Sequence, residues 1–273
     1  MNGAGALIKV LENEGVQVIF GYPGGAVLPL YDALLCSDIK HVLTRTEQSA
    51  AHAACGYSRS TDKVGVCWAT SGPGATNLIT GIANAYLDST PLVAITGQVA
   101  TELIGHDVFQ EVDIVGATTP FTKHNYLVKD AADIPRIVKE AFYIANTGRK
   151  GPVLIDVPKD IQEKVRNYDF DVEIALRSYK PNMEPNFRQM AKLEEAIKDS
   201  KRPLLCVGGG CMLSRVSDKI IELSNKINAP FVTTMLGIGA VPTDHENCLG
   251  MIGQSGLKAA NDAVESADLV VVL

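Results

Sequence analysis

One acidic residue lies where a β-strand is expected to pass into a helix. Glu47 follows the apolar pair at 42–43 and precedes an alanine-rich segment, 48–57, which predicts a tightly packed helix. Thr46 is a suitable N-cap, so Glu47 would lie in the first helical turn at the carboxyl edge of a parallel sheet, where open α/β sheets bind ligands. The alternative explanation is that Glu47 only complements the helix dipole.

Two glycine-rich loops strengthen the case for a ligand site. Gly21-Tyr-Pro-Gly-Gly and Thr70-Ser-Gly-Pro-Gly-Ala-Thr-Asn each follow an apolar run and open a helical pattern. The spacing of the first loop does not fit the dinucleotide fingerprint GxGxxG. Either loop alone is explained by a tight turn, although adjacent glycines also permit close backbone approach to a flat or anionic ligand. If both loops and Glu47 end strands of one sheet, they converge on one crevice.

The elements that must position these residues follow a βα rhythm. Apolar runs without strict alternation, separated by helical patterns, predict an α/β fold: a parallel sheet with helices on both faces. The predicted strands are 16–20, 42–44, 64–69, 92–96 and 153–157. The predicted helices are 5–14, 26–35, 48–59, 75–87 and 132–146.

A polar stretch at 166–186, with prolines and no sustained period, is interpreted as a linker between a first domain, 1–165, and a second α/β domain, 187–273. In the second domain we expect helices at 187–199, 215–227 and 257–266, and strands at 203–207, 231–235 and 267–273. Because the chain stops in an apolar run typical of a central strand, we expect a fragment truncated inside this domain.

Composition excludes several classes of function. A net charge of −6 and a pI near 5.4 argue against a nucleic-acid-binding surface. The six cysteines form no CxxC pair and no metal-ligand spacing with the five histidines, so buried reduced thiols are expected. No segment has the apolar length of a membrane span, and no signal-peptide pattern is present. These features together predict a cytoplasmic protein without a membrane partner.

Five motifs in this order carry a family resemblance: Gly-Tyr-Pro-Gly-Gly, Thr-Glu-Gln-Ser-Ala-Ala-His-Ala-Ala, Thr-Ser-Gly-Pro-Gly-Ala-Thr-Asn, Gly-His-Asp-Val-Phe-Gln-Glu-Val-Asp-Ile and Thr-Lys-His-Asn. The chain resembles the catalytic large subunit of the acetolactate synthase family, over essentially all of 1–165 and more loosely to the end. These thiamine-diphosphate enzymes have pyrimidine-binding, central and diphosphate-binding domains. The resemblance implies that 1–165 is the pyrimidine-binding domain and that 187–273 is part of the central domain.

The resemblance also assigns roles. Glu47 matches the glutamate that hydrogen-bonds N1′ of the cofactor's aminopyrimidine, which favours the tautomer that deprotonates thiazolium C2. Gln110 matches a residue beside the reacting centre, and these two are the catalytic candidates. Phe109 and Lys123 match positions of the substrate channel, although Phe109 could instead be core and Lys123 a solvated surface charge. The thiamine-diphosphate pocket is implied to contain Tyr22, Pro23, Gly24, Glu47, Pro73, Asn77 and Gln110.

A second cofactor, structural FAD, is implied by segments that resemble the family's flavin-binding parts. These FAD candidates are Arg149, Gly208, Gly209, Gly210, Thr234, Leu236, Gly237, Met251, Ile252 and Gly253. The family usually has Met-His-Gly where this chain has Met251-Ile252-Gly253, so this contact departs from the pattern. The family binds Mg²⁺ through a Gly-Asp-Gly segment that this chain lacks, so no metal ligand is assigned here.

The implied activity is decarboxylation of pyruvate on thiamine diphosphate and carboligation to a second 2-oxo acid, pyruvate or 2-oxobutyrate, in branched-chain amino-acid synthesis. The implied partner is a second copy of the subunit, because the family's active site lies at a dimer interface; a small regulatory subunit is left open. The alternatives are another thiamine-diphosphate enzyme, such as a pyruvate oxidase or oxalyl-CoA decarboxylase, and a non-catalytic cofactor-binding fragment.

Overall fold

The computed structural model describes residues 1–273, which form two compact units, Met1–Asn182 and Met183–Leu273. Each unit contains one sheet whose strand pairs are all parallel, with helices packed against it. The predicted α/β fold class is therefore confirmed.

The first unit contains a six-stranded sheet in the order β2-β1-β3-β4-β6-β5. Every residue of β3, β4 and β6 is buried, as expected for central strands covered on both faces. The strands are β1 (Val18–Gly21), β2 (Lys40–Leu43), β3 (Gly65–Ala69), β4 (Leu92–Gln98), β5 (His124–Leu127) and β6 (Pro152–Pro158).

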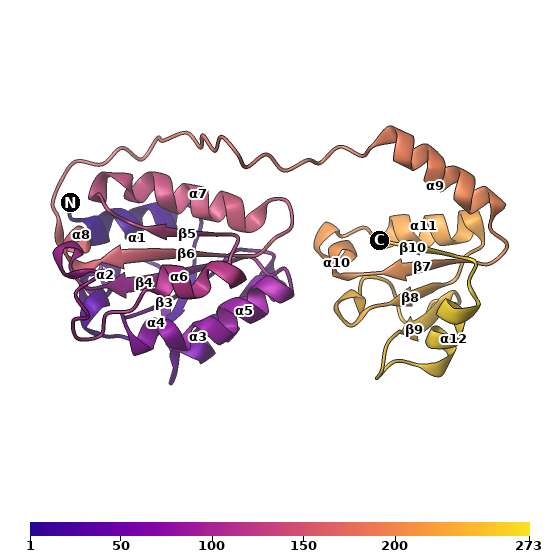
Figure 1. The fold of residues 1–273 in the computed structure, drawn as a ribbon, viewed down its shortest axis with the longest axis horizontal. Coiled ribbons are helices and arrows are strands. Elements are labelled where there is room, and N and C mark those ends of the chain that lie inside the picture. The colour runs from indigo at the N-terminus through magenta and orange to yellow at the C-terminus, as the bar shows by residue number, and fades with distance from the viewer. The chain divides into compact units, whose positions relative to one another are not determined.

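Helices cover both faces of this sheet, and Figure 1 shows α1 and α7 on one side and α3 and α5 on the other. The α-helices are α1 (Gly3–Asn13), α2 (Leu28–Leu34), α3 (Glu47–Thr61), α4 (Pro73–Asn77), α5 (Ile79–Leu87), α6 (Ile114–Thr118), α7 (Ile134–Asn146) and α8 (Lys159–Glu163). Short 3-10 helices occupy Gly25–Val27, Thr101–Leu103, Thr119–Phe121 and Ala131–Asp133.

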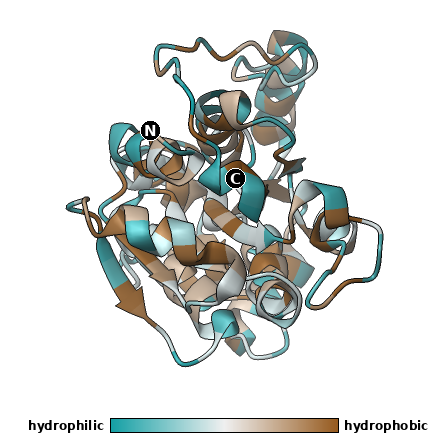
Figure 2. Cartoon of the chain, turned by 90° about the vertical axis from the view of Figure 1, so that its left-hand side faces the viewer, coloured by the Kyte–Doolittle hydropathy of each residue, from teal (hydrophilic) through white to brown (hydrophobic).

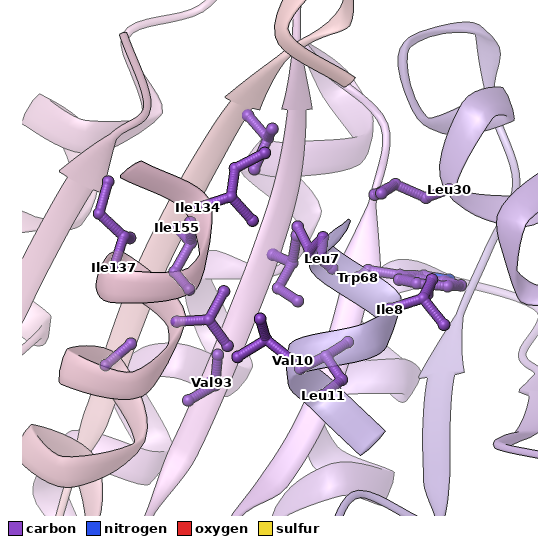
Figure 3. Packing of buried hydrophobic residues seen from close by; sticks show 14 of the residues in the cluster. Leu7, Ile8, Val10, Leu11, Leu30, Trp68, Val93, Ile134, Ile137 and Ile155 are labelled. Atoms are coloured by element: carbon purple, nitrogen blue, oxygen red, sulfur yellow. The ribbon is translucent and has the colours of Figure 1, made fainter. Parts of the chain in front are cut away.

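The main core of this unit lies between the sheet and α1, α2 and α7. Leu7 of α1 and Ile134 of α7 pack over Trp68 and Ile155 of the strands (Figure 3). Each of these four side chains is at most 1% exposed. Fully burying such a side chain contributes roughly 1.5–3 kcal/mol, so the strands are held rigidly beneath the loops that follow them. Figure 2 shows hydrophobic residues along the strands and hydrophilic residues on the outward faces of the helices.

One strand of the first unit was missed, and one predicted helix is wrong. The strand β5 was not expected, because His124-Asn-Tyr-Leu contains no apolar run; it is an edge strand that pairs only with β6. The single helix predicted over 75–87 is two helices, α4 and α5, which meet at Leu78.

The segment predicted as a linker contains no helix or strand between α8 and α9 (Phe187–Asp199), and only an isolated bridge pairs Val165 with Asn2. Its aromatic residues Tyr168, Phe170 and Tyr179 pack against the core of the first unit. The Tyr179 hydroxyl donates to the Thr147 carbonyl at 2.7 Å. This stretch thus covers the surface of the first unit over part of its length.

The second unit contains a four-stranded parallel sheet in the order β10-β7-β8-β9. Side chains of α9 and α11 pack in one apolar cluster of this unit, and those of α12 pack in another. The strands are β7 (Pro203–Val207), β8 (Phe231–Thr233), β9 (Cys248–Met251) and β10 (Leu269–Val272). The helices are α9, α10 (Gly209–Ser214), α11 (Ser217–Ile227) and α12 (Lys258–Ser266), with a 3-10 turn at Met235–Gly237.

Two elements of the second unit were not expected from the sequence. The short helix α10 begins with Gly209 and Gly210, and it was not predicted because glycine disfavours helices. The strand β9 contains Gly250 in a positive-φ conformation, and this segment was interpreted only as a loop motif. None of the helices in either unit is both long and apolar enough to cross a membrane.

Candidate cofactor site at the carboxyl edge of the first sheet

The strand order of the first sheet places a topological switch point at β1, where a crevice for a ligand is expected. The chain leaves β1 towards β2 on one side and returns to β3 on the other, so β1 lies between them. Open α/β sheets bind ligands at such switch points, beyond the carboxyl ends of the strands. The loops after β1, β2 and β3 are the two glycine-rich loops and the segment that carries Glu47.

Glu47 is the first residue of α3, capped by Thr46, whose hydroxyl oxygen accepts a hydrogen bond from the Ser49 amide at 3.2 Å. The half-buried carboxylate of Glu47 accepts from Asn77 Nδ2 through Oε2 at 2.9 Å. Asn77 ends α4, so the loop after β3 orients an acid that follows β2. The other carboxylate oxygen, Oε1, has no hydrogen-bond partner in the chain and is available to a ligand.

Thr70 joins the two glycine-rich loops. Its hydroxyl oxygen accepts from the Ala26 amide at 3.1 Å. A Cβ atom placed on Gly24 would lie 2.5 Å from the Thr70 side chain, so only glycine fits this approach. A Cβ on Gly74 would lie 2.7 Å from Thr70 Cγ2 and 3.4 Å from Glu47 Oε1. The structure therefore brings Gly24 and Gly74 together with Glu47 and Asn77.

Gln110, in the segment that follows β4, packs against the second loop. The N-cap residue of α4, Gly72, has φ +58° and ψ −122°, a backbone conformation that L side chains rarely adopt. A Cβ on Gly72 would lie 2.9 Å from the Gln110 Cα. Gln110 itself has φ +60°, which is uncommon for a residue with a side chain. The backbone of Gln110 is thus held against the loop that orients Glu47.

Hydrogen bonds to the neighbouring residue Glu111 fold the segment 105–111 around Gln110. The Glu111 carboxylate accepts from the amides of Gly105 and of Val108, the latter at 3.0 Å, and these bonds lower the pKa of Glu111. Phe109 is 87% exposed, so the alternative that it belongs to the core is wrong. On the loop after β1, Tyr22 and Pro23 are exposed at the rim of the crevice.

Lys123 and Arg149 are not brought to this edge, because they precede β5 and β6 and so lie at the amino edge of the sheet. The half-buried Lys123 ammonium donates to the carbonyls of Ile144 and Thr147 and to the Tyr179 hydroxyl. The alternative of a solvated surface charge is therefore wrong, while its substrate-channel role stays a prediction.

Arg149 is exposed and is engaged inside the first unit. Its Nε donates to Ser89 Oγ at 2.8 Å, and its guanidinium carbon lies 5.7 Å from the centre of the Tyr86 ring. The predicted contact between Arg149 and FAD stays a prediction.

Three predicted FAD segments of the second unit are neighbours at the carboxyl ends of β7, β8 and β9. A Cβ on Gly209 would lie 3.0 Å from Leu236 Cβ, and a Cβ on Gly237 would meet the carbonyl of Val207. The Ile252 amide donates to the Thr233 carbonyl at 3.0 Å, which sets the third segment beside the second. The remaining members of these segments are Gly208, Gly210, Thr234, Met251 and Gly253.

Sequence reasoning missed three buried side chains that hold the loops of the first unit. Gln162 Nε2 donates to the Ala26 carbonyl at 2.8 Å. Gln98 Nε2 donates to the Val112 carbonyl at 2.8 Å and to Asp156 Oδ2 at 3.0 Å. The available signal was a polar residue inside an otherwise apolar strand, as in Ala-Ile-Thr-Gly-Gln and Leu-Ile-Asp-Val.

All six cysteines are free, as expected, and four of them are buried. Burial raises the pKa of the Cys55 thiol to about 11, which keeps it protonated and unreactive. The chain contains no group of three or more His, Cys, Asp or Glu residues that could hold a metal ion.

Comparison with known proteins identifies the family of this chain. Residues 1–117 match the thiamine pyrophosphate enzyme N-terminal TPP binding domain, and residues 190–273 match the thiamine pyrophosphate enzyme central domain. The chain therefore belongs to the thiamine pyrophosphate enzymes, with an N-terminal and a central domain.

The similarity to acetolactate synthases extends over the whole chain. It is 50% identical to a probable acetolactate synthase large subunit of Methanocaldococcus jannaschii, with 100% of this chain and 47% of the relative covered. It is 49% identical to an acetolactate synthase of Mycobacterium bovis and 47% identical to an acetolactate synthase large subunit of Buchnera aphidicola. These alignments cover 100% of this chain and 44% and 48% of the relatives. The chain thus spans about half the length of the curated relatives it matches.

Proposed function

We propose that this chain supplies the pyrimidine-binding and central domains of an acetolactate synthase. The complete enzyme decarboxylates pyruvate and joins the product to a second 2-oxo acid, pyruvate or 2-oxobutyrate, in the synthesis of branched-chain amino acids. The similarity to acetolactate synthase large subunits along the whole chain supports this proposal. The observation that carries it is the Glu47 carboxylate, oriented by Asn77 at a switch-point crevice, with one oxygen free.

The residues present fit thiamine diphosphate. When bound, this cofactor supplies the electron sink that decarboxylation of a 2-oxo acid requires. The free Oε1 of Glu47 offers an ionisable acceptor for a ring nitrogen, and no cation of this chain competes for it. Gly24, Pro73 and Gly74 present little side-chain bulk beside it. The exposed Tyr22 and the half-buried Gln110 lie on the loops that would border the ring.

Glu47 has two tasks in this proposal. Its carboxylate would hold or accept a proton at Oε1 when a pyrimidine nitrogen is bound, and such charge-assisted bonds are roughly twice as strong as neutral ones. Asn77 donates to Oε2 and so keeps Oε1 directed at the crevice. The backbone of Gln110 lies beside the second loop, and in this proposal its side-chain amide would bind a substrate oxygen.

Glu47→Gln tests this function in the complete protein. The amide lacks the charge and the proton-accepting oxygen pair, so acetolactate formation from pyruvate should fall by at least about 100-fold, within the usual contribution of general acid–base catalysis. Circular dichroism should remain unchanged. Glu195→Gln, which alters an exposed glutamate of α9, is the matched control and should keep full activity. Near-normal turnover of folded Glu47→Gln would remove Glu47 from this role.

Product analysis separates the alternatives in the same assay. Acetolactate supports the proposal, whereas acetyl phosphate with hydrogen peroxide would indicate a pyruvate oxidase. Formyl-CoA from oxalyl-CoA would indicate the third enzyme class. No turnover of any of these substrates by the complete protein would support a non-catalytic cofactor-binding role.

The remaining parts of the proposal concern assembly. We infer that the Mg²⁺ ligands and the diphosphate site belong to a domain outside these residues, and that a second copy of the subunit completes the active site. A small regulatory subunit and a cytoplasmic location are part of the same inference. The absence of a Gly-Asp-Gly segment here is consistent with a metal site located elsewhere.

We also infer that the second unit binds FAD in a structural role. The adjacent segments after β7, β8 and β9 support this, because they include Gly210 and Gly253, where an added Cβ would meet nothing within 4 Å. The complete protein should purify yellow, and Arg149→Ala should lower FAD affinity about tenfold or more if a charged hydrogen bond is lost. Colourless protein that is fully active without added FAD would contradict this inference and leave Ile252 as a sign of a lost cofactor.

A further inference from the structure

Gln98 is a buried glutamine at the carboxyl end of β4, only 3% exposed. Its Nε2 donates to the Val112 carbonyl at 2.8 Å and to Asp156 Oδ2 at 3.0 Å. Its Oε1 accepts from the Val99 amide at 2.9 Å. Both N–H groups and the carbonyl oxygen are therefore used, and the amide can adopt only one orientation.

Asp156 fixes Gln98 from the neighbouring strand. It lies on β6 opposite Thr96 of β4 and is 1% exposed. Thr96 Oγ1 donates to Asp156 Oδ1 at 2.7 Å, which leaves Oδ2 for Gln98. When the carboxyl group is protonated, its hydroxyl can donate to Thr96 Oγ1 while Oδ2 still accepts from Gln98. Gln98 is consequently held in both protonation states.

The carbonyl that Gln98 binds lies two residues after Gln110. Segment 105–113 is mostly exposed and is hydrogen-bonded largely to itself, through the Glu111 carboxylate and short turns. The Gln98–Val112 bond is the one hydrogen bond between this segment and the sheet. On the other side of Gln110, its backbone meets Gly72. Gln110 thus lies between its backbone contact with Gly72 and the Gln98–Val112 hydrogen bond, which we call the tie.

We propose that Gln98 is a positioning residue for Gln110, which it holds at the candidate site by binding the Val112 carbonyl from the rigid strand β4. The role of Gln110 in this inference rests on the proposed function, whereas the hydrogen bond from Gln98 to the Val112 carbonyl does not depend on it. Without Gln98, no hydrogen bond joins residues 111–113, which follow Gln110, to the sheet. The segment would then sample other positions while the sheet stays folded.

Hydrogen exchange tests the tie without any cofactor or activity. In Gln98→Met of the complete protein, peptides covering 105–113 should exchange about tenfold faster, because one buried hydrogen bond is lost. Gln162→Met is the matched control: it also removes a buried glutamine, but one that holds Ala26, so exchange of 105–113 should be unchanged. Unchanged exchange in folded Gln98→Met would overturn the proposal. If that variant does not fold, Gln98→Asn, which keeps an amide one methylene too short, replaces it with the same expectation.

A double-mutant cycle tests whether the tie acts through Gln110. Gln98→Met should lower kcat about tenfold in the wild-type background and less than about twofold in Gln110→Ala, because the two changes remove one function. Equal losses in both backgrounds would show that Gln98 acts only on stability and would overturn the positioning role. A wild-type protein that forms no acetolactate would contradict the proposed function, while the exchange experiment would still decide the tie.

Discussion

Glu47 shows how one residue can fit two explanations until its neighbours are known. A glutamate in a first helical turn complements the helix dipole wherever it points. An amide donor that fixes one carboxylate oxygen is not needed for that purpose, and it costs side-chain entropy. Asn77 supplies such a donor across 30 residues of sequence. The pair therefore favours a site in which the direction of the other oxygen matters.

Asp156 gives a pH prediction at the same scale. Burial, above all, raises the pKa of this carboxyl from 3.8 to about 7, since bonds from Thr96 and Gln98 offset burial only in part and Asp113 adds repulsion. The folded state thus binds the proton more tightly than the unfolded chain. The contribution of protonated Asp156 to the free energy of unfolding is fully present below the pKa of the unfolded chain. It is lost as the pH rises through the folded-state pKa of about 7.

Asp156→Asn removes this titration. The free energy of unfolding of the variant relative to wild type should rise between about pH 4 and pH 7 and then become constant, with a total change on the order of 4 kcal/mol. Scanning calorimetry at several pH values measures the difference. The idea fails if the two proteins differ by the same amount at every pH.

At the scale of elements, the glycine loops fit together through Thr70, and this gives a matched pair of substitutions. Gly24→Ala places a methyl group 2.5 Å from the Thr70 side chain, so Thr70 must move and lose its bond to Ala26. We expect a loss of about 1–3 kcal/mol, as for other overpacked sites. Gly25→Ala meets nothing within 4 Å and should change stability by less than about 0.5 kcal/mol. Urea denaturation compares the two, and equal losses would show that Thr70 does not join the loops.

The predicted elements with clear apolar runs, such as 92–96 and 153–157, appear in the structure within two residues, because a buried parallel strand must be apolar on both faces. Two of the four edge strands, β5 and β9, escaped prediction. The strand β5 is flanked on one side only and carries polar residues, and β9 contains a glycine at positive φ. Patterns of burial are weak there, since these strands are only partly buried.

The candidate site was predictable only where backbone geometry restricts the residue type. Gly24, Glu47 and Asn77 follow strands in the sequence, and topology then brings them together. Gln98 and Asp156 lie 58 residues apart and meet only through the register of β4 with β6. The register between two strands cannot be predicted from the local sequence pattern of either strand. Conversely, Lys123 lies at the other edge of the sheet because it precedes β5, a strand that the sequence did not predict.

At the scale of the whole molecule, each unit has its own core and its own carboxyl edge. Clusters around Trp68 and around Phe231 share no residue, and each unit contains its own parallel sheet. The first unit places a carboxylate at its edge, whereas the second presents glycine-rich backbone after β7, at the point where β10 pairs on the other side. In the proposed function, the first unit would therefore supply the acid–base group, and the glycine-rich backbone of the second unit would serve a different ligand.

This division predicts how residues 1–273 behave alone with thiamine diphosphate. The diphosphate carries most of the ligand's charge, and its usual counterion is a metal held by oxygen ligands. The chain has no cluster of three or more His, Cys, Asp or Glu residues for that ion, and Glu47 at the crevice repels an anion. Isothermal calorimetry should therefore show weak binding that Mg²⁺ does not improve, and no acetolactate should form. The complete protein is the positive control and should bind in a Mg²⁺-dependent manner. Micromolar, Mg²⁺-dependent binding to residues 1–273 alone would contradict this, because it would require metal ligands within these two units.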